Sequence, residues 1–254
     1  MIKFFRKIRQ KLLTENKFSK YLIYAIGEII LVVIGILIAL QINNFNNEKQ
    51  LREIEQEYLL SLQTEFKTNL NKINKSILEN EKRVNATENM LTLFDSNVRD
   101  TINGNEISNM IYSVVATEAT YQPSKGVLTD IISSGNLNLI KNKQLRQYLA
   151  SFESKLDFMQ TQQSITLSTK EAIKSILIKN GSIRMVLKSQ GVNFEHQSIS
   201  DGINNKQMYS SVEFENILLD YYLTIKATNG PRFFGGIKEH IELVLDEITS
   251  ELKK

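Results

Sequence analysis

The most constraining feature of the sequence is an apolar run from Leu22 to Leu40. It contains 19 residues, of which thirteen are Leu, Ile or Val, and its one charged residue is Glu28. A helix of about 20 such residues crosses the roughly 30 Å hydrocarbon core of a bilayer. The thirteen aliphatic side chains favour insertion by about 4–8 kcal/mol, whereas one acid costs about 2.5–3.5 kcal/mol. We therefore predict a transmembrane helix over residues 21–42.

A cleaved signal peptide and a core helix of a soluble protein are the two alternatives to a transmembrane helix. A cleaved signal peptide has an apolar region of about 7–15 residues that ends in small residues, whereas this run is longer and ends in Ala39-Leu40-Gln41-Ile42. A core helix of a soluble protein rarely stays apolar on all sides for five turns. The run therefore indicates an uncleaved signal anchor.

The flanking charges predict the orientation of the anchor. Residues 1–20 contain seven Lys and Arg, and residues 43–62 contain two. Basic flanks stay in the cytoplasm, so we expect a cytoplasmic N-terminus at the inner membrane and a periplasmic remainder in a Gram-negative bacterium. The segment 1–20 is either an amphipathic helix on anionic lipid or only the positive flank of the anchor. The apolar run and its basic flank make membrane lipid an expected partner. The rest of the chain is nearly neutral, so nucleic acid is not an expected partner.

Two stretches resemble a known family. The sequence GEIILVVIGILIALQINN, residues 27–44, is followed by Phe45 where the pattern usually has tryptophan, and SSGNLNLIKNKQLRQYL occupies residues 133–149. Both are similar to patterns in domain-of-unknown-function family 6090, a group of uncharacterised bacterial membrane proteins. The resemblance implies a single-pass membrane topology and supplies no activity.

The residues after the run are expected to continue as a helix. Neither glycine nor proline occurs between Gly35 and Gly104, and apolar residues recur from Leu51 to Ile77 with a period near 3.7. That period is helical and closer to an eleven-residue repeat than to a strict heptad. We predict a stalk helix within 43–100, ending near residue 97, either continuous with the anchor or kinked at 41–44.

Residues 101–254 are predicted to form an extracytoplasmic helical domain packed with the stalk. Glycine, proline and asparagine separate helical patterns from one another, and no stretch alternates as a strand does. The predicted fold class is all-α: one transmembrane helix, a long stalk helix and a helical bundle. The expected helices span residues 106–118, 125–132, 142–179, 207–228 and 233–252, and residues 189–206 form a polar loop.

The sequence offers little material for catalysis. Cysteine is absent, which excludes disulfides and thiolate sites. Glu195, His196 and Asp201 could hold a metal, but such a polar loop is more often simply solvated. The glycine-rich residues 230–236 lack the Lys-Ser/Thr of a phosphate-binding loop and suit a helix–helix turn. We therefore expect no catalytic, cofactor or metal residues.

Glu28 marks a candidate contact face on the transmembrane helix. At 100° per residue, it shares one stripe with Tyr24, Gly35 and Ala39. Small residues allow another helix to approach, and an acid is less costly when it faces protein. This pattern favours a helix contact, in a homo-oligomer or with a partner membrane protein. A tolerated protonated side chain and a proton or ion role are the alternatives.

The leading functional hypothesis is a membrane-anchored periplasmic helical module that is not an enzyme and binds a protein partner or a ligand. The alternative is an enzyme that acts on envelope material through a site invisible in the sequence. A cleft with clustered carboxylates of shifted pKa would favour the enzyme.

Overall fold

The computed structural model describes residues 18–199 and 202–253, which form helices and connecting segments without a strand. This confirms the all-α prediction. The chain divides into two units, Met1–Glu57 and Tyr58–Lys254. Helix α2, Phe18–Leu91, contributes residues to both and is a single helix, which is one of the two alternatives that the sequence left open.

The described part of the first unit exposes its apolar side chains. From Leu22 to Leu40 every side chain is exposed or half-buried, although most are aliphatic. Among the described residues, one helix is long and apolar enough to cross a membrane, and it contains this segment. The basic segment 1–20 lies almost wholly outside the described residues, so its predicted amphipathic helix stays a prediction.

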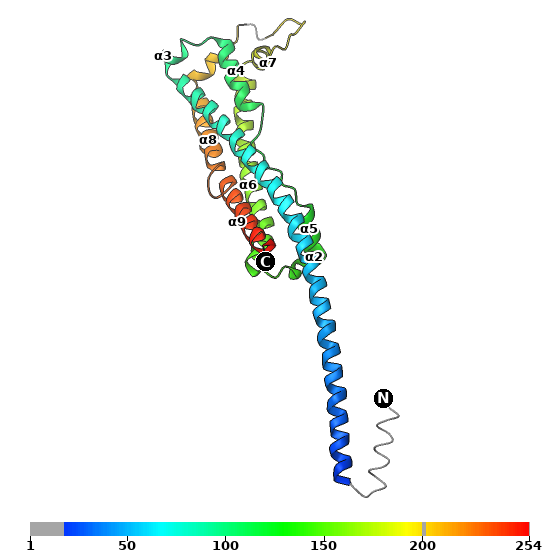
Figure 1. Ribbon diagram of the computed structural model, residues 1–254. Coiled ribbons are helices and arrows are strands. Elements are labelled where there is room, and N and C mark those ends of the chain that lie inside the picture. The colour runs from blue at the N-terminus through cyan, green and yellow to red at the C-terminus, as the bar shows by residue number, and fades with distance from the viewer. Residues whose placement is uncertain (1–17, 200–201, 254) are drawn as a thin grey trace. The chain divides into compact units, whose positions relative to one another are not determined.

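The second unit is a helical bundle built around three columns. The first is the part of α2 from Tyr58 onward, and the second is α6, Lys143–Asn180. The third consists of α8, Val212–Thr228, followed by α9, Phe234–Leu252, and both pack against α6. In Figure 1, α8 and α9 follow one another along the same side of α6.

Shorter helices cover the two ends of these columns. The 3-10 segment η1, Thr92–Phe94, and helix α3, Ser96–Arg99, follow α2. Further along the chain come α4 (Gly104–Val115), α5 (Gly126–Ser133), η2 (Asn136–Leu139), α7 (Ile183–Ser189) and η3 (Asn205–Ser210). Helices α4 and α7 pack together.

Side-chain caps explain why several helices begin where they do. Asn103 accepts hydrogen bonds from the backbone N–H groups of Asn105 and Glu106, and Glu106 accepts one from the backbone of Asn103. This reciprocal capping box starts α4. Asn142 caps α6 as predicted, by accepting from the backbone N–H of Leu145. Gly135 ends the α5 region with a φ of 75°, the left-handed conformation that favours glycine.

Some predicted boundaries differ from the structure. The long helix ends at Leu91 and not near residue 97, because a 3-10 turn follows and Asp95 then caps the short helix α3. The segment 183–189, not predicted as a separate helix, forms α7 because Ser182 caps it through the backbone N–H of Met185. The predicted polar loop 189–206 therefore begins where α7 ends, and its last residues belong to η3.

The predicted period of α2 is also wrong, for a physical reason. Apart from Glu65, the buried positions from Leu59 to Met90 alternate steps of three and four residues, which is a heptad spacing. Apolar residues alone gave a longer period because several of these positions are polar: Asn69, Ser76, Asn80, Arg83 and Thr87. These residues are buried without being hydrophobic, so a pattern of hydrophobic residues misses them.

The buried polar residues separate two apolar cores. One core joins α2, α5, the first half of α6 and α9, and contains Phe66, Phe152 and Phe234. The other joins the end of α2, α4, the second half of α6, α7, η3 and α8. Between them lies a set that we call the polar layer: Asn80, Arg83, Thr87, Gln162, Thr166, Lys170 and Thr228.

Hydrogen bonds across the polar layer fix the register of the three columns. The Asn80 amide donates to the carbonyl of Ile225 at 2.7 Å and to the Asn229 side chain at 3.0 Å. Asn229 in turn donates to the carbonyl of Ile77 at 3.1 Å, and Gln162 donates to the carbonyl of Thr224 at 3.1 Å. The break between α8 and α9 is thereby bound to one level of α2 and one level of α6.

Replacing Asn80 by alanine should destabilise the bundle. The change leaves the Ile225 carbonyl and the Asn229 oxygen without their donor in a buried site, a loss of about 2–3 kcal/mol. We expect the melting temperature of the detergent-solubilised chain, followed by circular dichroism, to fall by about 5–10 °C. The matched control is Asn74→Ala, an exposed position on the same helix, which should change it by less than about 2 °C. Equal melting temperatures for both variants would contradict this role of Asn80.

Candidate functional site

The candidate site lies where the polar layer meets an irregular segment. Residues 116–125 form no helix and connect α4 to α5 along the surface of α2. Polar side chains of α2 hold this segment. Asn69 donates to the Ser124 carbonyl at 2.8 Å and accepts from its backbone N–H at 2.7 Å, while Ser76 donates to the Thr120 carbonyl at 2.8 Å. Glu65 accepts from the backbone N–H groups that start α5.

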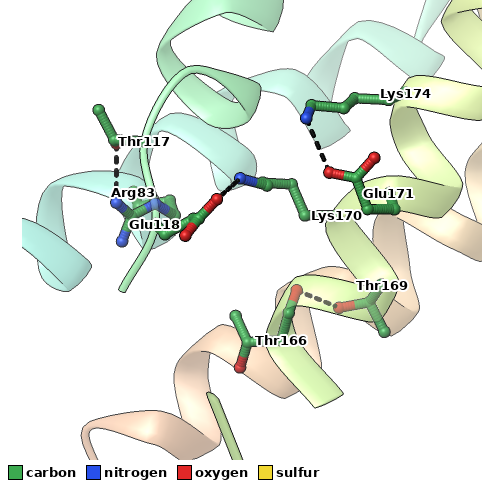
Figure 2. A network of polar contacts seen from close by, with 8 residues as sticks. All are labelled: Arg83, Thr117, Glu118, Thr166, Thr169, Lys170, Glu171 and Lys174. Carbon is green, nitrogen blue, oxygen red and sulfur yellow. Dashed lines mark hydrogen bonds and ion pairs between the residues drawn. The ribbon is translucent and has the colours of Figure 1, made fainter. Parts of the chain in front are cut away.

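Helix α6 provides a buried lysine to this segment. Lys170 is 3% exposed, and its Nζ atom lies 2.7 Å from Oε1 of Glu118, whose side chain is 49% exposed. Figure 2 shows Lys170 extending from α6 to the Glu118 carboxylate. One member of this ion pair is therefore buried and fixed, whereas the other lies at the surface on non-helical backbone.

The position of Glu118 determines its ionisation. The hydrogen bond from Lys170 and the positive charge of that residue lower the pKa of Glu118, and Lys174 and Arg83 lower the pKa further. Lys174 itself pairs with Glu171 at 2.7 Å on the exposed side of α6 (Figure 2). Glu118 is consequently a carboxylate at neutral pH and not a proton donor.

Arg83 is the second buried cation of the site. It is 4% exposed and donates from NH2 to the Thr117 hydroxyl at 2.8 Å and from NH1 to the Asn80 side-chain oxygen at 3.3 Å. Its Nε atom is buried and has no hydrogen-bond partner in the described part of the chain. Desolvation by burial lowers the pKa of Arg83, an effect that the negative charge of Glu118 partly opposes.

A cavity opens beside the Lys170–Glu118 pair. Its volume is about 270 Å³. Glu118 is the one carboxylate among its walls, which also include several donor side chains, Gln163 and Tyr221 among them, and the apolar side chains of Ala119 and Leu167. The full lining is Glu118, Ala119, Thr120, Gln160, Gln163, Ser164, Thr166, Leu167, Lys170 and Tyr221.

Two residues of the cavity wall, Gln163 and Tyr221, have side chains that can donate a hydrogen bond. The Gln163 amide nitrogen is buried and has no hydrogen-bond partner among the described residues. Tyr221 is 1% exposed, and desolvation, together with the nearby charge of Glu118, raises its pKa to about 12 against the opposing charge of Arg83. Its hydroxyl therefore keeps its proton at neutral pH. A cation and neutral donors thus line the same cavity as a single carboxylate, an arrangement suited to binding an anion.

This site was not predicted from the sequence. Lys170, in a long helix, resembles a solvated residue, and Glu118 lies in a stretch without a motif. One signal was present: the buried stripe of α6 that contains Leu145 and Met159 continues at helical spacing through Gln162, Thr166 and Lys170. Polar residues at positions of a buried stripe are the sequence signature of the polar layer.

The structure places the predicted residues of the transmembrane stripe on helix α2. Tyr24 and Glu28 are half-buried, whereas Gly35 and Ala39 are exposed, and the spacings of four and seven residues put all four on one face. A Cβ atom added at Gly35 would meet nothing within 4 Å. The stripe is therefore open at its small residues, and its role as a contact stays a prediction.

The other motifs lie apart from the cavity. The Nε2 atom of His196 is 2.9 Å from a nitrogen of Arg184, while Asp201 lies outside the described residues. The glycine-rich turn connects α8 to α9, as predicted, and Phe234 is buried. Phe233 is only half-buried and stacks on Phe158 with ring centroids 5.3 Å apart, so only one of the two phenylalanines enters the core.

Comparisons with known proteins support the resemblance noted in the sequence. The model of a family of unknown function (DUF6090) matches residues 28–219, most of the chain, so the chain belongs to this family. The match includes Glu28, Gly35 and Ala39 of the predicted stripe and every residue that lines the cavity except Tyr221. No curated protein and no solved structure matches the chain.

Replacing Glu118 should show that it balances a buried charge. Glu118→Gln leaves the Lys170 ammonium buried without its anion, so we expect a loss of about 1–2 kcal/mol. The melting temperature of the full chain in detergent should fall by about 2–8 °C. The control is Glu171→Gln, which breaks the exposed pair with Lys174 and should cost less than about 0.5 kcal/mol. A smaller effect for Glu118→Gln than for Glu171→Gln would contradict the assignment.

Proposed function

We propose that this member of the DUF6090 family is a membrane-anchored helical module whose body lies in the periplasm and binds a ligand or a protein partner. The observation that carries the proposal is the exposed apolar segment Leu22–Leu40. A contiguous exposed surface of this kind is favourable only in lipid or against protein. The preceding basic residues support an N-terminus in the cytoplasm.

The cavity of the second unit supports a binding role. Its one lining carboxylate, Glu118, is ionised and paired with Lys170, which suits recognition of charge. A general acid in an enzyme would need a raised carboxyl pKa, and here the pKa is lowered. The site therefore favours a binding module over the alternative of an envelope-acting enzyme.

The absence of cysteine allows a clean test of the topology. Single cysteines are introduced at Lys67, an exposed position of α2, and at Lys11, before the apolar segment. In intact cells with a permeabilised outer membrane, a membrane-impermeant maleimide should label Lys67→Cys and leave Lys11→Cys unlabelled. Both should react after lysis. Labelling of Lys11→Cys but not Lys67→Cys before lysis would reverse the proposed orientation.

The transmembrane helix is proposed to pair with another transmembrane helix through Tyr24, Glu28, Gly35 and Ala39. Gly35 leaves room for close approach, since no atom lies within 4 Å of a Cβ added there. An acid in the membrane is less costly when it hydrogen-bonds protein. The partner is either a second copy of the chain or another membrane protein.

Replacing Glu28 should weaken this association. Hydrogen bonds between transmembrane helices contribute about 0.6–2 kcal/mol, so Glu28→Leu should weaken association roughly 3- to 30-fold. Glu28→Gln should keep most of it, because an amide still donates and accepts, and Gly35→Ile should weaken it by blocking close approach. Energy transfer between labelled full-length chains in bilayers, with and without membrane extract, measures the effect. Equal association of Glu28→Leu and wild type in both settings would refute the contact.

A further inference from the structure

The cavity beside Lys170 points to a specific class of ligand. We propose that it binds a small organic carboxylate, whose carboxylate group replaces Glu118 on the Lys170 ammonium. This inference rests on the proposed binding function of the second unit and adds the chemistry of the ligand. It is carried by the ion pair, the donors in the cavity wall and the size of the cavity.

The buried ammonium of Lys170 needs an anion, which either the protein or a ligand can supply. Lys170 is a buried cation whose ion-pair partner is Glu118 in the cavity wall, and the buried Arg83 is offset by the negative charges of both Glu79 and Glu118. The nearby Lys174 and Glu171 pair with each other and add no net charge. A buried cation without a counter-charge is costly, so a ligand carboxylate that takes the place of Glu118 on Lys170 would be stabilised there.

The donors of the cavity match the two oxygens of a carboxylate. Lys170 supplies a charged donor, and the buried amide nitrogen of Gln163, another residue of the cavity wall, has no hydrogen-bond partner within residues 18–199 and 202–253. The protonated Tyr221 hydroxyl is a third donor in the cavity wall. A carboxylate has about four acceptor positions and no donor, so it complements these groups better than an alcohol or an amine would.

Glu118 occupies the position of the ligand's carboxylate in the absence of ligand. Its side chain is half exposed, so it can rotate into water when another carboxylate binds Lys170. The backbone need not move with it, because Arg83 holds Thr117 and Ser76 holds Thr120 on either side. Glu118 therefore competes with the ligand, and its removal should increase affinity.

The remaining walls set the size and polarity of the ligand. At about 270 Å³ the cavity is slightly below the roughly 300–1,000 Å³ of pockets for drug-sized molecules. Ala119, Leu167 and the ring of Tyr221 provide apolar contacts next to the donors. A carboxylate with a short aliphatic or single-ring substituent fits this combination.

The experiment measures binding of probe carboxylates to the full-length chain in detergent micelles. Acetate, butyrate and benzoate are titrated by calorimetry, with benzamide as the neutral analogue of benzoate and inorganic phosphate as a different anion. We expect benzoate or butyrate to bind and benzamide to bind at least about tenfold more weakly, the scale of one charge-assisted hydrogen bond. Binding by none of the three carboxylates, or equal binding of benzoate and benzamide, would overturn the proposal. Tighter binding of phosphate would also overturn it, by assigning a different ligand class.

Two variants test the displacement of Glu118. Glu118→Gln should bind the same carboxylate about tenfold more tightly than wild type, since no internal anion competes. Lys170→Met should reduce binding below detection, whereas the matched control Lys174→Met, one turn further along α6, should stay within about twofold of wild type. Should Lys170→Met fail to fold, Glu118→Gln decides alone. Unchanged or weaker binding by folded Glu118→Gln contradicts the proposal.

A cavity-filling variant locates the binding. Leu167→Trp places an indole in the cavity wall and should weaken carboxylate binding by about tenfold, at a melting temperature close to that of wild type, because Leu167 is 42% exposed. Unchanged affinity would place the ligand elsewhere and refute the site. The outcome is independent of the labelling of Lys67→Cys, so a wrong topology and a wrong ligand class give different results.

Discussion

The polar layer is the constraint on which the second unit depends. Most helical bundles bury a continuous apolar core, but here buried polar residues divide the core in two. Such residues are tolerated only when their hydrogen bonds are made. Asn80, Gln162 and Asn229 satisfy theirs by reaching backbone carbonyls of neighbouring columns. The columns are thereby fixed at one height relative to each other, a specificity that apolar packing alone supplies less strictly.

The same layer explains the position of the cavity. Lys170 continues the buried stripe of α6, so its ammonium group lies inside the bundle and needs an anion there. The irregular segment 116–125 provides one through Glu118, and α2 holds that segment with Asn69 and Ser76. The polar layer therefore both fixes the register of the helices in the core and contributes to the charged cavity at its edge.

The surfaces of the two units are suited to different solvents. The described part of the first exposes aliphatic side chains along the run to Leu40, which suits hydrocarbon surroundings. The second buries its large apolar side chains in two cores and presents polar groups at a cavity. A ligand signal from the proposed periplasmic body would need a partner helix to cross the membrane, and the proposed contact at Glu28 offers one.

The sequence by itself determined the fold class, the apolar segment and most helices. These follow from local physics: hydrophobic periodicity, caps such as Asn142, and glycine at positive φ in Gly135. It did not determine the heptad spacing of α2 or the site at Lys170. Both depend on polar residues whose burial is decided by partners distant in the chain, such as Asn80 with Ile225 and Lys170 with Glu118. Only the tertiary structure places those partners, because a buried polar group is acceptable only where a complementary group meets it.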